Sequence, residues 1–303
     1  MKQEVNDINT VYSFMTFNEG YILPARTAIA SLKANKGNER VVIYILHFSI
    51  SDNGIKLLES DSNDSVIIKC IKVDEKEIPN IKLHFHLTKE VILKVLAYRY
   101  IPKNVDKIFY FDGDVIILRS ITEFYSIDIE NNYFVCYEDQ KINPKELDRL
   151  GLPHDFKYAC AGAMLMNIKK MRNDSSYESR ILIFFETTKI NLSFLEQDMI
   201  NLVFAPTGEI MILGYPYRFN RFVDTIRKWN IEKEKIGLIH YEGPHLKPWK
   251  GSATRHYMLW WKYARTTKEY KPLFWKTMPI YIRNLILKTF AKTRILFCKL
   301  IKK

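Results

Sequence analysis

Two kinds of hydrophobic pattern alternate along the N-terminal third of the chain. Continuous apolar runs rich in β-branched residues predict strands, and apolar residues repeating every three or four positions predict helices. The predicted strands are residues 11–16, 41–48, 66–73 and 107–111. The predicted helices between them are residues 24–32, 55–58 and 91–96, the last two capped by Ser51 and Thr88. This order of elements predicts an α/β fold whose sheet is mostly parallel and has helices on both faces.

The pattern becomes mixed beyond residue 112. Apolar runs predict further strands over residues 133–137 and 163–167, and helical spacing predicts helices over residues 176–186 and 196–204. The pattern over residues 280–301 predicts one amphipathic helix. Its apolar side carries Ile282, Leu285, Ile286, Phe290, Leu296, Phe297 and Leu300, whereas Lys288, Lys292, Lys299 and Lys302 lie opposite. We therefore expect a body of residues 1–261 and a basic helical tail of residues 262–303.

The composition is that of a folded protein, and its charge is concentrated in the tail. Hydrophobic residues make up 47% and charged residues 26% of the 303 positions, which excludes a disordered chain and a low-complexity repeat. The formal net charge is +12. Residues 262–303 contain twelve Lys or Arg and one acidic residue, so they carry +11 and the body carries +1. Such an excess predicts an anionic partner: nucleic acid, a membrane surface or a phosphorylated ligand.

The sequence predicts a protein of the reducing cytosol. The N-terminal residues lack the apolar stretch of a signal peptide. The longest apolar run, residues 41–48, is interrupted at His47 and is far shorter than the roughly 18–20 residues that span a bilayer. The cysteines are widely separated and show no metal-binding spacing, so we expect neither a disulfide nor a zinc site at Cys70, Cys136, Cys160 and Cys298.

Two carboxylates one residue apart follow the apolar strand that ends at residue 111. They are Asp112 and Asp114, and Gly113 between them lets the backbone pass close to a ligand. Ligands of open α/β sheets bind at the carboxyl ends of the strands, and oxygen ligands suit Mg²⁺ or Mn²⁺. A divalent cation site is the functional interpretation, and a polar turn between two strands is the alternative.

Three other segments are candidates for the same site. His240 begins a loop with Gly243 and Lys247-Pro-Trp, where an imidazole can complete a metal site and a lysine can meet phosphate. Cys160-Ala161 leads into a buried strand, and Glu196-Gln197-Asp198 opens a helix. The alternatives are a stiff Gly/Pro loop, tight core packing, and acidic residues that suit the helix dipole.

These motifs, in this order and together with the N-terminal strand, resemble glycosyltransferase family 8. The family comprises retaining enzymes of the GT-A fold, including bacterial lipopolysaccharide α-galactosyl- and α-glucosyltransferases and glycogenin. The resemblance covers residues 11–249 and implies a Rossmann-like, mostly parallel mixed sheet flanked by helices. It also implies that Asp112, Asp114 and His240 bind Mn²⁺ or Mg²⁺, which bridges the diphosphate of a UDP-sugar.

The resemblance further implies a set of donor-binding residues with several departures from the family pattern. The set comprises Thr16, Phe17, Asn18, Tyr21, Lys94, Asp112, Gly113, Asp114, Cys160, Ala161, Glu196, Gln197, Gly243 and Lys247. The family often has aspartate at Asn18, arginine at Lys94 and asparagine at Cys160, so uracil, phosphate and sugar contacts differ in detail here. Gly243 and Lys247 are separated by one residue more than the commonest family spacing.

The same resemblance implies a reaction and partners. The catalytic residues are Gln197 and Asp198, and a Gln beside the reacting sugar favours front-face attack over a covalent intermediate. His86 is placed at the acceptor pocket. The implied function is transfer of galactose or glucose from a UDP-hexose to a lipid-linked saccharide in lipopolysaccharide or other surface-polysaccharide synthesis.

The basic helical tail predicts where in the cell the protein is located. A basic amphipathic helix with aromatic residues lies in a membrane interface, so we expect a peripheral enzyme on the cytoplasmic face of the inner membrane. The alternative is a helix that packs on the body and leaves its lysines solvated. The competing functions are a sugar nucleotidyltransferase, which needs a Gly-rich basic loop that residues 14–20 lack, and a nucleic-acid-binding protein, which only the net charge suggests. We expect no nucleic-acid partner.

Overall fold

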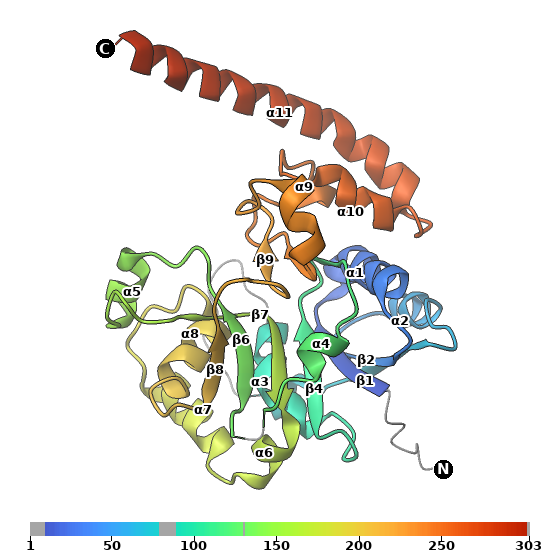
Figure 1. Cartoon of the computed structure of the whole chain (residues 1–303). Coiled ribbons are helices and arrows are strands. Elements are labelled where there is room, and N and C mark those ends of the chain that lie inside the picture. Colours follow the sequence, from blue (N-terminus) through green and yellow to red (C-terminus); the bar gives the residue numbers. More distant parts are fainter. Residues whose placement is uncertain (1–9, 79–88, 130, 302–303) are drawn as a thin grey trace.

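The computed structural model describes residues 10–78, 89–129 and 131–301, which form two sheets surrounded by helices (Figure 1). The central seven-stranded sheet has the order β3-β2-β1-β4-β7-β6-β8. Its strands are β1 Thr10–Thr16, β2 Arg40–His47, β3 Val66–Lys72, β4 Lys107–Phe111, β6 Phe134–Glu138, β7 Ala159–Asn167 and β8 Ile210–Leu213. Only β7 runs antiparallel to its neighbours, β4 and β6; the other pairs in this sheet are parallel. The expected mixed, mostly parallel α/β sheet is confirmed.

Helices cover both faces of this sheet because side chains alternate between the faces along each strand. In β1, Tyr12 and Phe14 pack in one core with α3, α6, α7 and α8, whereas Val11 and Met15 pack in the other with α1, α2 and α4. The helices are α1 Ile22–Asn35, α2 Asp52–Glu59, α3 Leu93–Leu96, α4 Thr122–Tyr125, α5 Pro144–Leu150, α6 Ile168–Asn173, α7 Tyr177–Thr187, α8 Leu195–Val203, α9 Trp229–Glu232, α10 Tyr257–Ala264 and α11 Tyr270–Ile301.

The structure departs from the predicted elements in two places near the cavity. The helix expected over residues 91–96 is the single turn α3 between the 3₁₀ turns Lys89–Ile92 and Ala97–Arg99, and its expected cap Thr88 lies outside the described residues. The strand expected from residue 163 begins at Ala159, because Cys160 pairs with Tyr137 across a bulge in the β6–β7 ladder. This longer β7 carries the small residues of the motif at residues 160–162 into the sheet.

A second, three-stranded sheet has the order β5-β10-β9 and consists of very short strands. They are β5 Val115–Ile117, β9 Arg221–Phe222 and β10 Leu238–His240. Strand β5 begins directly after Asp114 and runs antiparallel to β10, with Val115 opposite His240. The pairing therefore brings the end of the Asp-Gly-Asp turn next to the histidine of a distant loop.

The C-terminal helices join the body through an aromatic core. Tyr270, Phe274 and Tyr281 of α11 pack with Trp260 and Trp261 of α10, so the expected boundary at residue 261 falls inside α10. The remainder of α11 extends beyond the body (Figure 1). None of the helices within the described residues is long and apolar enough to cross a membrane. Cys70, Cys136 and Cys160 are free thiols.

Replacing Trp260 by alanine should lower the free energy of unfolding by about 3–5 kcal/mol, because the indole is fully buried and its loss leaves a cavity. Urea denaturation followed by circular dichroism measures this. The matched control is Trp275→Ala, since that indole is 69% exposed and its removal should change stability by about 0.5 kcal/mol or less. Equal losses in the two variants would contradict the aromatic core described here.

Candidate functional site

A cavity of about 550 Å³ opens where β1 and β4 end, at the edge of the sheet where ligands of α/β folds bind. Most residues singled out in the sequence line it, although they come from distant parts of the chain. These are Thr16, Phe17, Asn18, Tyr21, Lys94, Asp112, Gly113, Asp114, Cys160, Glu196, Gln197, His240, Gly243 and Lys247. The spatial convergence of these separate motifs is the main feature of the site.

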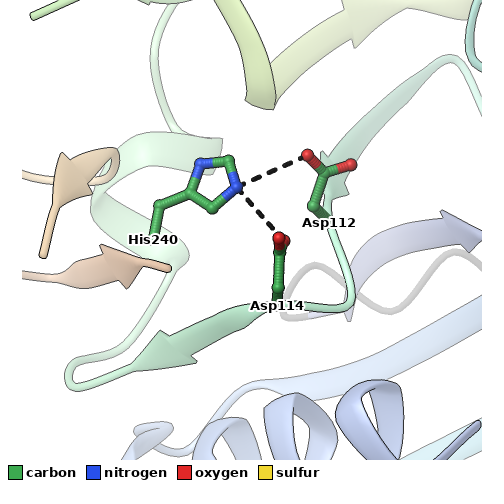
Figure 2. Close-up of side chains that lie close together, drawn as sticks. All are labelled: Asp112, Asp114 and His240. Atoms are coloured by element: carbon green, nitrogen blue, oxygen red, sulfur yellow. Dashed lines mark hydrogen bonds and ion pairs between the residues drawn. The ribbon is translucent and has the colours of Figure 1, made fainter. Parts of the chain in front are cut away.

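Three side chains at the centre of the cavity form a cluster that suits a divalent cation (Figure 2). His240 Nε2 lies 3.1 Å from Asp114 Oδ1 and 3.6 Å from Asp112 Oδ2. One ligand atom from each residue lies within 4.8 Å of the others. Two carboxylates and one imidazole form an oxygen-rich donor set of the kind that holds Mn²⁺ or Mg²⁺ together with substrate oxygens. The residues therefore fit such an ion.

The backbone around this cluster explains its shape. Asp112 N–H donates to the Gly162 carbonyl at 3.0 Å, and Tyr241 N–H donates to the Asp114 carbonyl at 3.0 Å. A Cβ at Gly162 would collide with the imidazole, 2.6 Å from Nδ1 of His240, and would lie 3.2 Å from Asp112 Oδ2. Asn220 Oδ1 lies 3.2 Å from Nδ1 of His240, and such a contact orients the ring with Nε2 toward the carboxylates.

Lys247 supplies positive charge to one side of the cluster. Its Nζ forms a buried ion pair with Asp114 Oδ2 and donates to the Tyr241 carbonyl at 2.9 Å. Burial by itself raises the pKa of Asp114, but the charges of Lys247 and His240 outweigh burial and hold it below its usual range. Asp114 is therefore ionised and available to a cation at neutral pH.

Lys94 supplies positive charge to the other side. Its Nζ lies 2.6 Å from Glu196 Oε1 and 3.1 Å from Asp112 Oδ1, over the ring of Tyr110. Burial lowers the pKa of Lys94, but the two carboxylates outweigh burial and raise it well above its ordinary value. A charged lysine thus lies beside the candidate cation site, at the position where the resemblance predicted a donor contact.

Gln197 is held in one orientation at the cavity wall. Its Oε1 accepts from Ala161 N–H at 2.8 Å, and its Nε2 donates to Asp139 Oδ2 at 3.2 Å. Ala161 itself does not line the cavity and acts on it only through this bond. Burial raises the pKa of Asp139. Gln197 therefore presents a neutral, fixed amide to whatever occupies the cavity.

Asp198 lies outside the cavity lining, unlike its neighbours on α8. Its carboxylate is fully buried and accepts from Tyr158 Oη, from Arg149 Nη2 at 3.1 Å and from Phe194 N–H at 3.0 Å. These bonds hold the start of α8, where Leu195 adopts a φ of 25°, a strained value for a residue with a side chain. The structure thus gives Asp198 a supporting position behind the cavity wall and not on it.

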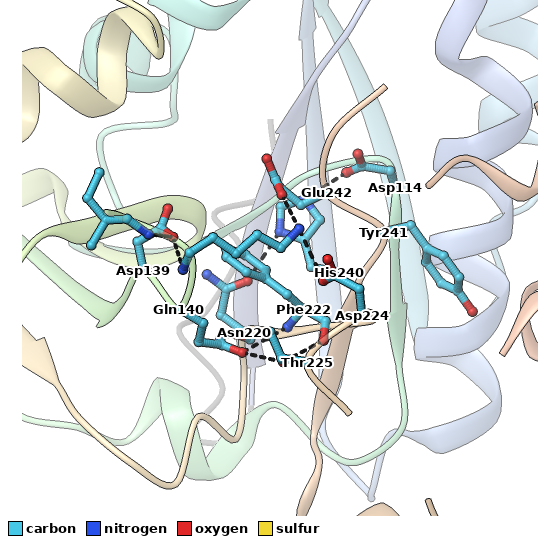
Figure 3. A network of polar contacts seen from close by, with 12 residues as sticks. Asp114, Asp139, Gln140, Asn220, Phe222, Asp224, Thr225, His240, Tyr241 and Glu242 are labelled. Atoms are coloured by element: carbon cyan, nitrogen blue, oxygen red, sulfur yellow. Dashed lines mark hydrogen bonds and ion pairs between the residues drawn. The ribbon is translucent and has the colours of Figure 1, made fainter. Parts of the chain in front are cut away.

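A polar network fixes the wall formed by the loop after β6 (Figure 3). The Gln140 side chain donates to the Asn220 carbonyl, and Lys141 Nζ lies 2.6 Å from Glu242 Oε2 and 3.1 Å from Asp224 Oδ1. These contacts connect the central sheet to the loop after β10. They place Asp139 and Glu242 on the same stretch of the cavity lining.

Several lining residues were not among the candidates that the sequence predicts. They are Glu90, Val91, Tyr110, Asp139, Gly162, Phe194, Glu242, Pro244 and Lys250. Asp139 follows the short strand β6 and belongs to no motif, so only the strand order could have located it, whereas Glu242 lies within the loop that begins at His240. His86, expected at the acceptor pocket, lies outside the described residues.

Two residues that depart from the family pattern, Asn18 and Cys160, have defined surroundings at the cavity. Asn18 Oδ1 accepts from Gly20 N–H at 3.1 Å and caps a 3₁₀ turn at the cavity. Cys160 is buried against the cavity, and burial raises the pKa of its thiol well above the ordinary value. Cys160 is therefore a neutral thiol and offers a sugar hydroxyl only a weak partner.

Comparison with known sequences points to one family. The sequence model of glycosyl transferase family 8 matches residues 13–253. A Haemophilus influenzae protein named as a glycosyltransferase is 24% identical over 215 residues, 68% of this chain and 64% of the relative. Glycosyltransferase GlyE of Streptococcus pneumoniae is 24% identical over 262 residues, 80% of this chain and 58% of that protein. The chain thus spans less than two thirds of the length of either relative.

Comparison with solved structures shows the fold. The galactosyltransferase LgtC, solved with donor and acceptor sugar analogues, is similar with a TM-score of 0.72 at 18% identity, over 87% of this chain and 100% of that chain. The bifunctional glycosyltransferase WbbM also has a TM-score of 0.72 at 18% identity, over 94% of this chain and 53% of that chain. The expected GT-A fold is confirmed.

Replacing Gly162 by alanine should weaken the binding of Mn²⁺ about 10–100-fold, because the added methyl group collides with the His240 ring. Titration with Mn²⁺ monitored by the electron paramagnetic resonance of the free ion measures this affinity. Gly214→Ala is the matched control, since nothing lies within 4 Å of its Cβ position. Undiminished Mn²⁺ affinity in Gly162→Ala would contradict the metal assignment.

Proposed function

The chain belongs to glycosyltransferase family 8, and from this we propose that it transfers galactose or glucose from a UDP-sugar to a saccharide acceptor with retention of anomeric configuration. The observation that carries this proposal is the convergence of Asp112, Asp114, His240, Lys247 and Gln197 on one cavity. In this proposal Asp112, Asp114, His240 and Lys247 stabilise the leaving group. Gln197 occupies the place toward which a sugar attached to the diphosphate would extend.

The donor occupies the cavity with its diphosphate at the centre. We assign uridine to the end formed by Thr16, Phe17, Asn18 and Tyr21, since this loop follows the first strand of the sheet. Gly113 and Gly243 leave room for the backbone to approach the phosphates. In this arrangement the hexose points toward Glu196, Gln197 and Cys160.

Charge on the departing UDP is stabilised by the groups around the cluster. Asp112, Asp114 and His240 would hold the divalent cation, which when bound supplies Lewis-acid stabilisation of diphosphate oxygens. Lys247 adds a positive charge beside Asp114, and Lys94 adds one beside Asp112. Because both lysines are buried, their attraction for phosphate is screened less than it would be in water.

The placement of Gln197 and Asp198 supports front-face displacement. The bond from the anomeric carbon to the phosphate oxygen breaks as the acceptor oxygen bonds to the same face, and the acceptor proton passes to the departing phosphate. Of the two α8 side chains on the cavity wall, Glu196 is paired with Lys94. Gln197 is a neutral amide, fixed by Ala161 and Asp139, which can accept or donate hydrogen bonds to the sugar. The Asp198 carboxylate accepts hydrogen bonds from Arg149 and Tyr158, so in this mechanism it supports α8 and does not attack the sugar.

We place the acceptor saccharide at the acidic wall. Asp139 and Glu242 both line the cavity, and carboxylates accept hydrogen bonds from sugar hydroxyls. The contribution of His86 stays a prediction. We further propose that the acceptor is a lipid-linked saccharide of lipopolysaccharide or another surface polysaccharide, as in the bacterial enzymes that the sequence resembles.

The outer side of α11 supports a membrane partner. Trp275, Ile282, Ile286 and Phe290 are 69%, 49%, 49% and 70% exposed and recur at helical spacing on the side away from the body. Lysines at residues 271 and 276 flank this stripe. An amphipathic helix with aromatic residues and flanking cations binds the interface of an anionic bilayer. We therefore propose a peripheral enzyme at the cytoplasmic face of the inner membrane, close to a lipid-linked acceptor.

Purified protein should release UDP from UDP-galactose or UDP-glucose in the presence of Mn²⁺, and Asp114→Asn should lower that rate at least about a hundredfold. The loss follows because the substitution removes a ligand charge and leaves Lys247 without its partner. A coupled assay for UDP across both donors and their N-acetyl forms measures the rate. Asp64→Asn, on an exposed loop, is the control. Full activity of Asp114→Asn would refute the proposed function.

Removing the exposed apolar stripe of α11 should weaken binding to vesicles of anionic phospholipid at least about tenfold, because Trp275→Ser/Ile286→Ser deletes the apolar area that enters the interface. Co-sedimentation with vesicles measures the bound fraction. Ile183→Ser is the matched control, since Ile183 is 57% exposed on α7. Unchanged sedimentation of the double variant would exclude the stripe as the membrane contact.

A further inference from the structure

The loop between β10 and α10 connects the cavity to the C-terminal helix. Gly243 and Lys247 line the cavity, and the 3₁₀ turn Pro248–Lys250 follows immediately. Within this turn Lys250 N–H donates to the Lys247 carbonyl at 3.1 Å, and Gly251 N–H donates to the Pro248 carbonyl at 2.9 Å. The position of Lys247 is therefore coupled over one short turn to that of Gly251.

Gly251 is seated directly against α11. A Cβ at this position would lie 2.7 Å from Cβ of Ile280 and 2.9 Å from the Thr277 carbonyl oxygen, so only a glycine allows this approach. Its φ of 71° is also in the left-handed region that favours glycine. The helix and the loop are thus in contact at the level of their backbones.

Two polar side chains of α11, one helical turn apart, hold the same stretch of loop. Asn284 Nδ2 donates to the Gly251 carbonyl at 2.9 Å, and Lys288 Nζ donates to the Ala253 carbonyl at 2.9 Å. The sequence places Lys288 opposite the apolar side of the helix, where we expected it to bind the membrane surface. Its bond to Ala253 shows that it faces the body and serves the loop.

The inner side of the loop contacts the uridine end of the cavity. The Trp249 ring packs edge to face on Tyr21 with 5.7 Å between ring centroids, and it lies 5.2 Å from the ring of Trp260. Tyr21 lines the cavity. A shift of the loop away from α11 would therefore disturb both Lys247 and Tyr21.

We propose that α11 is a positioning element of the donor site: Asn284 and Lys288 hold the loop at Gly251 and Ala253 and thereby set the place of Lys247. This inference rests on the proposed function, in which Lys247 binds the donor diphosphate. The helix that carries the membrane stripe on its outer side consequently determines donor affinity through its inner side.

The test removes the two bonds and leaves the outer stripe intact. In Asn284→Asp/Lys288→Met neither side chain can donate to the loop, and we expect UDP to bind about three- to tenfold more weakly in the presence of Mn²⁺, as measured by isothermal titration calorimetry. The midpoint of thermal unfolding should stay within a few degrees of the parent value, since both side chains lie at the surface of the helix. Lys288→Arg retains a donor and should bind UDP as the parent does.

The matched control is Arg283→Met/Thr289→Asp, which makes the same change of net charge on exposed positions of the same helix. UDP affinity should be unaffected in that variant. Equal UDP affinity of the parent and Asn284→Asp/Lys288→Met would overturn the inference and leave the proposed function standing. Failure of the parent itself to bind UDP would instead overturn the proposed function. If the double variant is unfolded, Lys288→Met alone, at an exposed position, decides between the same outcomes.

Discussion

The pairing of β5 with β10 joins two parts of the chain that meet at the cluster of Asp112, Asp114 and His240. Asp114 and His240 are 126 positions apart, and their contact exists because Val115 and His240 lie opposite each other in the antiparallel ladder. The same ladder starts the loop that carries Lys247. Asp112 is tied separately, through its backbone bond to Gly162 on β7. The positions of the side chains in the site therefore depend on two backbone pairings, that of β5 with β10 and that of Asp112 with Gly162.

Burial makes the charges around the cluster both costly and effective. Lys94 and Lys247 would be expensive to bury alone, and each is offset by a carboxylate within the cavity. Salt screens such buried charges far less than surface ones, so they can act strongly on an anionic ligand. Most of the charge of the basic tail lies on α11, which contributes no described residue to the cavity lining. The net charge of the protein therefore does not describe the charge at its site.

The sequence predicts the parts of the site that belong to regular elements. Asp112 and Asp114 follow a clear apolar strand, so their place at the sheet edge could be derived. Asp139 could not be, because it follows a short strand whose neighbours are determined only by the folded topology. Asp198 was grouped with Gln197 as its sequence neighbour, yet successive side chains on a helix point about 100° apart, and Asp198 faces the support behind α8.

The ion pairs of Lys94 and Lys247 affect the stability of the site when no cation is bound. Carboxylates gathered for a cation repel one another, and in many small metalloproteins the chain folds only after the ion arrives. Here Asp112, Asp114 and Glu196 face ammonium groups supplied by the chain itself. These ammonium groups offset part of the repulsion among the carboxylates and so stabilise the folded site when no cation is bound.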